Sequence, residues 1–168
     1  LLLALAIISL EQENDAEAEK IFERMIRWSL RVDDAYYHLA GIMERKKDLP
    51  QSLEYYKKVS RGYGFMPAQM RIASLIETLD GLESSRNHFT VQRSLYPLSS
   101  RNFSLLEVQF LSERRLFNEA IAVLDSELLQ KPNDIGILYR KAMIGGESGS
   151  INILEKALNR ILEIDPDN

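Results

Sequence analysis

A compact side chain recurs about every 34 residues along this chain, and this period constrains the fold more than any other feature of the sequence. The spacings between successive members are 34, 33, 35 and 34 residues. The members are Ala18, Ser52, Ser85, Ala120 and Leu154. A repeat of this length is typical of a solenoid of helix–turn–helix units, because each unit needs its neighbours to bury its apolar face. The slip from 33 to 35 places the one local irregularity of register around Ser85.

Two further columns keep the same period and indicate how the helices pack. Twelve residues before each compact side chain stands another residue that is nearly always small, and four residues after it stands a large apolar one. The first column is Ala6, Ala40, Ala73, Val108 and Ala142, and the second is Phe22, Tyr56, Phe89, Leu124 and Leu158. Small residues let two antiparallel helices approach closely, whereas the large residue lies one turn further on the same face and fills the space against the next unit.

Helix signals are present throughout, and no stretch alternates polar with apolar residues for long enough to predict a strand. Asp33 and Asp34 are predicted to cap a helix from Ala35 to about Arg45, and Pro50 suits the first turn of the helix that follows. The sequence therefore predicts an all-α chain of about ten helices, two in each unit.

These columns resemble the tetratricopeptide repeat (TPR) family. The best local matches are Leu116-Phe117-Asn118-Glu119-Ala120-Ile121, the Lys131-Pro132-Asn133-Asp134 ending, and Tyr36 to Ala40 followed by Ser52 and Tyr56. The resemblance implies a right-handed superhelical solenoid of about five antiparallel helix pairs. It covers residues 1–168 as a single array, with repeats at about 1–32, 33–65, 66–100, 101–134 and 135–168. We expect this array to be part of a longer protein.

Some positions depart from the family pattern. Glu107 and Lys141 stand where the family prefers Leu, and Gly145 stands where it prefers an aromatic residue. Looser packing of the first helices of the fourth and fifth repeats is therefore expected. The related half-a-tetratricopeptide and pentatricopeptide arrays, both associated with RNA, would carry more aromatic and charged signatures or a basic groove, and the sequence has neither.

Composition argues against several classes of function. The net charge is only −4 and no repeat carries a basic stripe, which disfavours a nucleic-acid partner. The chain contains no cysteine, which removes disulfides, thiolate zinc sites and cysteine nucleophiles. His38 and His88 each lack a second histidine one helical turn away, so no metal site is predicted. The Gly145–Ser150 segment lacks the Lys-Ser/Thr ending of a phosphate loop. We therefore expect no catalytic residue, no cofactor and no enzymatic activity.

Two runs of charged residues lie at predicted helix ends, where their charges are favourable. Arg45-Lys46-Lys47 is interpreted as a solvated turn at the C-terminal end of a helix, where cations are favourable. The acidic residues between Glu11 and Glu19 surround the start of a helix, where negative charge is favourable.

The resemblance also implies a binding groove, because the first helix of each TPR unit lines the concave face. Mapped onto this sequence, the groove is predicted from residues at corresponding positions of the five first helices. These are Leu3, Ile7, Tyr37, Glu44, Met70, Glu77, Leu105, Gln109, Tyr139 and Met143. The strip is mostly apolar, with aromatic and methionine side chains, and suits an amphipathic helix or an extended apolar peptide. Glu44 and Glu77 are expected to favour a basic ligand.

The predicted first helix is apolar on nearly all sides, and the predicted last helix keeps an apolar stripe. The segment Leu1–Leu10 is too short to span a bilayer and is interpreted as a repeat helix, so direct membrane insertion is not expected. The last helix also keeps an apolar stripe, and terminal repeats usually have polar outer faces. We therefore expect either further repeats or self-association through these ends.

The functional prediction is a non-enzymatic scaffold or adaptor that binds a protein or peptide. The alternatives are a structural spacer or self-association segment of a larger repeat protein and, least favoured, an RNA-binding helical array. The segment from Gly62 to Met70 also resembles the middle of large repeat lipoproteins of bacterial envelopes. This second resemblance tilts the expected location towards the bacterial periplasm rather than the cytoplasm.

Overall fold

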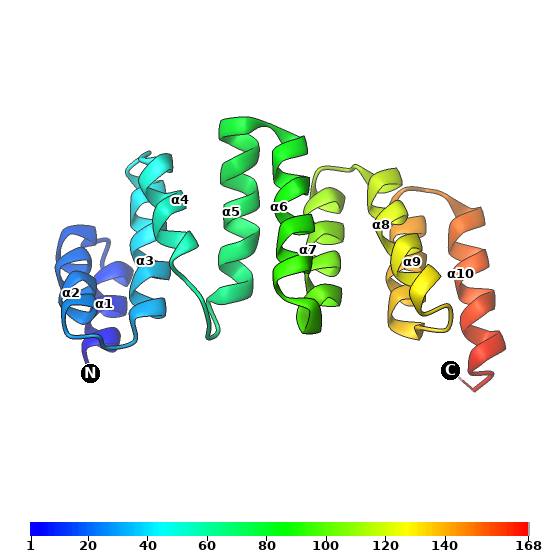
Figure 1. The fold of residues 1–168 in the computed structure, drawn as a ribbon, viewed down its shortest axis with the longest axis horizontal. Helices are drawn as coiled ribbons and strands as arrows, with labels where there is room; N and C mark the ends of the chain where they lie inside the picture. Colours follow the sequence, from blue (N-terminus) through cyan, green and yellow to red (C-terminus); the bar gives the residue numbers. More distant parts are fainter. Residues whose placement is uncertain (168) are drawn as a thin grey trace. The chain divides into compact units, whose positions relative to one another are not determined.

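The computed structural model describes residues 1–167, and these residues form ten α-helices, one short 3₁₀ helix and no strand (Figure 1). The helices are α1 (Leu2–Glu11), α2 (Asp15–Arg27), α3 (Val32–Arg45), α4 (Leu49–Lys57), α5 (Phe65–Asp80), α6 (Leu82–Leu95), η1 (Pro97–Ser99), α7 (Ser100–Glu113), α8 (Phe117–Gln130), α9 (Ile135–Glu147) and α10 (Ile151–Ile164). They pack as sequential antiparallel pairs, and the all-α prediction is confirmed.

The chain divides into two compact units, Leu1–Ser85 and Arg86–Asn168. The boundary lies inside α6, at the position where the 34-residue spacing slips. Each unit has its own packing chemistry.

Side-chain caps begin several helices. The side chain of Asn14 accepts a hydrogen bond from the backbone N–H of Glu17 at the start of α2, and Asp48 accepts one from Gln51 at the start of α4. The predicted cap at Asp33 and Asp34 was wrong: α3 begins at Val32, so both carboxylates lie within its first turn. The residue before α3 is Arg31, whose φ of 47° is left-handed. The side chain of Asp33 instead accepts hydrogen bonds from the backbone N–H groups of Ser60 and Arg61.

In the first unit, the two columns of small residues meet inside the helix pairs. The Oγ of Ser52 on α4 donates to the carbonyl of Ala40 on α3 over 2.9 Å, and the Oγ of Ser85 donates to the carbonyl of Ala73 over 2.7 Å. All four residues are buried. A larger side chain would hold the helices apart, and a buried hydroxyl needs the partner that the facing carbonyl supplies. This contact explains why small or hydroxyl residues recur twelve positions apart.

In the second unit, the pair α9 and α10 reaches the same close approach by another route. A Cβ added to Gly145 on α9 would lie 2.7 Å from the backbone nitrogen of Leu154 on α10, so the two backbones touch at this glycine. Leu154 occupies the column that is small elsewhere, and the glycine on the facing helix compensates for its size. The predicted loose packing at Gly145 was therefore wrong.

The two charged departures from the family pattern are also accommodated in the second unit. Glu107 is buried and pairs with Arg93 over 2.5 Å and with Arg86 over 3.4 Å. Lys141 is half-buried, and its Nζ lies 2.5 Å from the carboxylate of Asp125 on α8. Both charges thus lie beside a group of opposite sign rather than loosening the helices that carry them.

Candidate functional site

The predicted binding residues of the first unit are half-buried side chains on α1, α3 and α5. Leu3 packs against the apolar core that α1, α2 and α3 share. Ile7 lies one helical turn further along α1, and Met70 lies on α5. We call the described side chains of this set that belong to the first unit the first strip; they are Leu3, Ile7, Tyr37, Glu44, Met70 and Glu77.

Tyr37 is the centre of an aromatic cluster in the first unit. Its ring lies 5.6 Å from the ring of Tyr56 and 6.4 Å from the ring of Tyr63, both at steep interplanar angles. It also meets the imidazole of His38 edge to face at 5.5 Å. A Cβ on Gly64 would lie 3.1 Å from the Cγ of Tyr37, so the glycine lets the loop before α5 approach the ring. Contacts of this kind hold Tyr37 in one orientation.

Tyr63 is exposed on this cluster, and sequence reasoning did not identify it as a site residue. Its hydroxyl shares a hydrogen bond of 3.1 Å with the Nε2 of His38, whose ring stacks on Phe22 at 5.2 Å. Burial lowers the pKa of His38, and burial together with the negative charge of Asp34 raises the pKa of Tyr63. Both side chains are therefore uncharged at neutral pH. The only sequence signal was a tyrosine flanked by two glycines in a loop.

Glu44 is not an open carboxylate. Its two oxygens accept from Arg71 on α5, one of them from Nε over 3.0 Å and the other from Nη2. The expected attraction of Glu44 for a basic ligand was therefore wrong, because Arg71 already neutralises its charge. Glu77 is half-buried on α5.

The predicted binding residues of the second unit are more exposed. Tyr139 and Met143 lie one turn apart on α9, and both are exposed. Gln109 is also exposed and donates from Nε2 to the carboxylate of Glu113 over 2.9 Å, whereas Leu105 is half-buried. We call these four residues the second strip.

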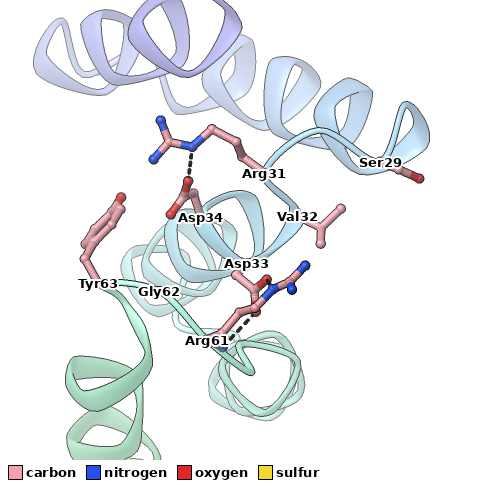
Figure 2. Close-up of a pocket in the computed structure, with 8 residues that line it drawn as sticks. All are labelled: Ser29, Arg31, Val32, Asp33, Asp34, Arg61, Gly62 and Tyr63. Carbon is pink, nitrogen blue, oxygen red and sulfur yellow. Dashed lines mark hydrogen bonds and ion pairs between the residues drawn. The ribbon is translucent and has the colours of Figure 1, made fainter.

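A cavity of about 310 Å³ opens in the first unit beside the start of α3 (Figure 2). We call it the loop pocket; its lining residues are Ser29, Arg31, Val32, Asp33, Asp34, Arg61, Gly62 and Tyr63. They come from the loop between α2 and α3, the first turn of α3, and the loop between α4 and α5. None of them belongs to the predicted strip, although Tyr63 joins the pocket to the aromatic cluster around Tyr37.

The two carboxylates of the loop pocket are already paired. One oxygen of Asp33 accepts from the backbone N–H of Ser60 over 2.6 Å and from that of Arg61 over 3.1 Å. Partial burial raises the pKa of Asp33, but these bonds, the Ser60 hydroxyl and the charge of Arg61 together lower it below the usual range. Asp34 pairs with the Nε of Arg31 on the other side of the helix (Figure 2). Asp33 thus ties the first turn of α3 to the loop between α4 and α5.

The basic run at the end of α3 also has a structural partner. Arg45 donates to both carboxylate oxygens of Asp15 over 2.9 and 2.6 Å, and Lys46 reaches the carboxylate of Glu19 over 2.5 Å. The hydrogen bond from Arg45 lowers the pKa of Asp15. The run is exposed at the C-terminal end of α3, as the sequence predicted, and Arg45 and Lys46 in addition attach α3 to α2 of the preceding pair.

Within residues 1–167, no cluster of three His, Cys, Asp or Glu side chains is arranged to hold a metal ion. No helix over the same residues is both long and apolar enough to cross a membrane.

No family model matches the chain. The TPR repeat-containing protein PA4667 of Pseudomonas aeruginosa is 27% identical over 137 residues, which are 82% of this chain and 23% of that protein. The chain therefore spans about a quarter of the length of this curated relative.

Among solved structures, the chain is similar to YrrB, described as a TPR protein with an unusual peptide-binding site. The TM-score is 0.50 at 11% sequence identity, and the match covers 99% of this chain and 86% of YrrB. At this level of identity the likeness shows the fold, a series of antiparallel helix pairs.

Proposed function

Because this chain is a tetratricopeptide repeat protein, we propose that it is a non-enzymatic scaffold that binds a protein or peptide through its first helices. The observation that carries the proposal is the pair Tyr139 and Met143, which leaves an aromatic ring and a thioether exposed one turn apart on α9. Covering large apolar side chains of this kind with a partner removes much apolar surface from water, which favours binding. The words that describe YrrB, a TPR protein with a peptide-binding site, support the same class of ligand.

In the first strip, the contact surface is an ordered aromatic ring flanked by aliphatic side chains. Tyr37 is held by its neighbours, so its ring loses little side-chain entropy when a ligand packs against it. Leu3, Ile7 and Met70 add half-buried apolar surface. The paired Glu44 can orient a polar group of the ligand but adds little affinity as a charge.

In the second strip, Tyr139 and Met143 form the anchor, while Leu105 and Gln109 contribute an apolar edge and an amide. An aromatic and a methionine side chain at helical spacing match a ligand with apolar residues on one side. The proposed ligand of each strip is accordingly an amphipathic helix or an extended apolar peptide.

A structural spacer is the second candidate. It is favoured by the ion pairs that link successive helix pairs, such as Asp15 with Arg45, because they brace neighbouring repeats. A spacer has no ligand of its own, so it predicts no dependence of any binding on Tyr37 or Tyr139.

The test is selection of peptides from a phage-displayed library on the purified chain, followed by calorimetric titration of the selected sequences. We expect selected peptides to be rich in apolar residues, and Tyr139→Ala or Tyr37→Ala to weaken binding about tenfold or more, since a buried aromatic anchor contributes roughly 2 kcal/mol or more. Leu129→Ala is the matched control, because Leu129 is exposed on the second helix α8 and lies outside both strips. Equal affinities for all four proteins would contradict the proposal and favour the spacer.

A further inference from the structure

The two arginines of the loop pocket use only part of their guanidinium groups within the chain. The Nε of Arg31 donates to Asp34, and the Nε of Arg61 lies 3.5 Å from Oδ2 of Asp33. The terminal nitrogens Nη1 and Nη2 of both arginines make no hydrogen bond or ion pair with residues 1–167. The side chains are well exposed, Arg31 at 60% and Arg61 at 85%. Each arginine therefore keeps two terminal donor nitrogens for a ligand.

The acceptors of the same pocket are largely used. One oxygen of Asp33 accepts from the backbone N–H groups of Ser60 and Arg61 and from the Ser60 hydroxyl. Its other oxygen faces Arg61. Asp34 is buried, and one of its oxygens accepts from Arg31. The formal charges of the two carboxylates and two guanidinium groups cancel, but the groups left without partners are mainly N–H donors. Guanidinium donors of this kind pair best with a carboxylate.

Tyr63 connects these donors with the first strip. Its ring lies 6.4 Å from the ring of Tyr37, and Tyr63 is itself a lining residue of the loop pocket. Figure 2 shows the carboxylate of Asp34 between the ring of Tyr63 and the guanidinium of Arg31. Burial and the charge of Asp34 raise the pKa of Tyr63, while the charge of Arg31 lowers it, so Arg31 lies near this tyrosine. A peptide that covers Tyr37 therefore has a continuous path over Tyr63 to Arg31.

The second arginine favours an acidic stretch over a single carboxylate. Arg61 and Asp33 lie on the other side of the first turn of α3 from Arg31 and Asp34 (Figure 2). The free donors are thus presented at two points of the pocket. Acidic side chains at two positions of a peptide match this arrangement, whereas one C-terminal carboxylate would leave the donors of one arginine unused.

We propose that the peptide bound by the first strip carries acidic side chains beside its apolar segment, and that Arg31 and Arg61 bind these carboxylates in the loop pocket. The inference rests on the proposed function, since it names the chemistry of the ligand at one end of the same surface. It is the opposite of the basic ligand that the sequence suggested from Glu44 and Glu77. The two terminal nitrogens of a guanidinium can donate to one carboxylate of the ligand while Nε keeps its contact with the aspartate.

The test compares peptides selected by two forms of the chain. Short random peptides are displayed on phage with their C-terminus fused to the coat protein, so that carboxylates come only from side chains. They are selected on the unmodified chain and on the double variant Arg31→Lys with Arg61→Gln. We expect the unmodified chain to select apolar segments flanked by Asp or Glu, and the double variant to select apolar segments without this acidic flank.

The double variant is chosen to preserve the fold. Lysine at position 31 keeps a positive charge beside the buried Asp34 but has only one nitrogen, which Asp34 engages. Asp33 keeps its bonds to the backbone N–H groups of Ser60 and Arg61 when Arg61 becomes glutamine. Far-UV circular dichroism establishes that the variant is folded. If it is not, Arg61→Gln alone replaces it, because the Arg61 side chain is 85% exposed.

Calorimetric titration then measures the contribution of the carboxylates. A selected peptide is synthesised with an amidated C-terminus, beside a version with Asn and Gln in place of its Asp and Glu. The neutral version should bind the unmodified chain about fivefold more weakly, and the difference should shrink between about 0.05 M and about 0.5 M salt. The double variant should bind both peptides equally. A free C-terminus on the neutral version should not restore its affinity.

Arg27→Gln is the matched control, because it removes an exposed arginine of the first unit that does not line the pocket, and it should leave the acidic preference unchanged. Peptides that bind through Tyr37 without an acidic flank, or equally well after neutralisation, would overturn the inference and leave the proposed function standing. An acidic preference that depends on the arginines but not on Tyr37 would support the pocket and contradict binding through the first strip. Selection of no peptide would contradict both.

Discussion

The two units place different chemistry in the same column of the repeat. In the first unit, Leu39 on α3 and Ile72 on α5 are buried and apolar. In the second unit, the same column holds Glu107 on α7, which is as deeply buried but lies between Arg86 and Arg93. A buried position in this column therefore does not have to hold an apolar residue. A charged residue is accommodated there when side chains of opposite charge lie beside it.

The physical reason is the cost of taking a charge out of water. A buried carboxylate is tolerated only where opposite charges and hydrogen bonds offset its lost hydration, and the pair adds little net stability over an apolar residue of similar size. Both guanidinium groups around Glu107 remain partly exposed, so water also shares in screening the cluster. The first unit offers Leu39 an apolar core instead.

The largest predicted effect comes from placing a glutamate at position 39 and a leucine at position 107. Leu39→Glu buries a carboxylate in an apolar core and should lower the free energy of unfolding of the first unit by about 3 to 5 kcal/mol. Glu107→Leu should change the stability of the second unit by less than about 1 kcal/mol or raise it, because it removes a buried charge and leaves the arginines able to reach water.

Urea unfolding measures both changes. Trp28 is the one tryptophan of the chain and lies in the first unit, so its fluorescence follows that unit, while far-UV circular dichroism follows all helices. Leu129→Glu, on an exposed position, is the control for adding a carboxylate. A larger loss for Glu107→Leu than for Leu39→Glu would mean that the ion pairs, rather than burial, stabilise this column.

A second, smaller effect is expected at the close contact between the two helices of a pair, which the two units make with different residues. Gly145→Ala places a methyl group against the backbone of Leu154 and should destabilise the second unit by about 1 to 3 kcal/mol. Gly146→Ala is the matched control: its Cβ would meet no atom within 4 Å, so better helix propensity should stabilise the unit by up to about 1 kcal/mol. Thermal denaturation distinguishes the two, and equal shifts would refute close contact at Gly145.

The smallest predicted effect is a dependence of the stability of the first unit on pH. Burial lowers the pKa of His38 in the folded chain, so the unfolded chain binds a proton at a higher pH than the folded one. The stability that neutral His38 contributes is complete above its ordinary pKa of about 6.5 and is lost as the pH falls towards the lowered value. The lowered pKa values of Asp15, Asp33 and Asp134 act only at more acidic pH.

Urea unfolding followed by Trp28 fluorescence at pH 7.5 and pH 5.5 checks this expectation. The midpoint should be lower at pH 5.5, and His38→Gln should reduce the difference. His88→Gln, in the second unit, should leave the difference unchanged. A difference that persists in His38→Gln would assign the pH dependence to another group.

The repeat period predicted the helices and much of the core well, because helix packing imposes a strict spacing on small and large residues. Ala40 and Ser52 lie where their columns require them, and their contact was implied by the twelve-residue offset. The partner of Arg45 was not predictable, since Asp15 is 30 residues away and only the packing of α3 on α2 brings them together. Tyr63 was missed for a different reason, because a residue in a loop belongs to no column of the repeat.

The sequence by itself determined the helix pairs and which face of each helix is small, large or polar, since these follow from periodicity and side-chain size along one helix. Only the tertiary structure decided which charged side chains form ion pairs within the chain. The sequence alone suggested that Glu44 could bind a ligand, but Arg71 already pairs with it. The sequence also suggested that Glu107 would disturb the packing, but two arginines pair with it. The reason is that a charge interacts with whatever lies within a few ångströms, and in a repeat array those neighbours come from other helices.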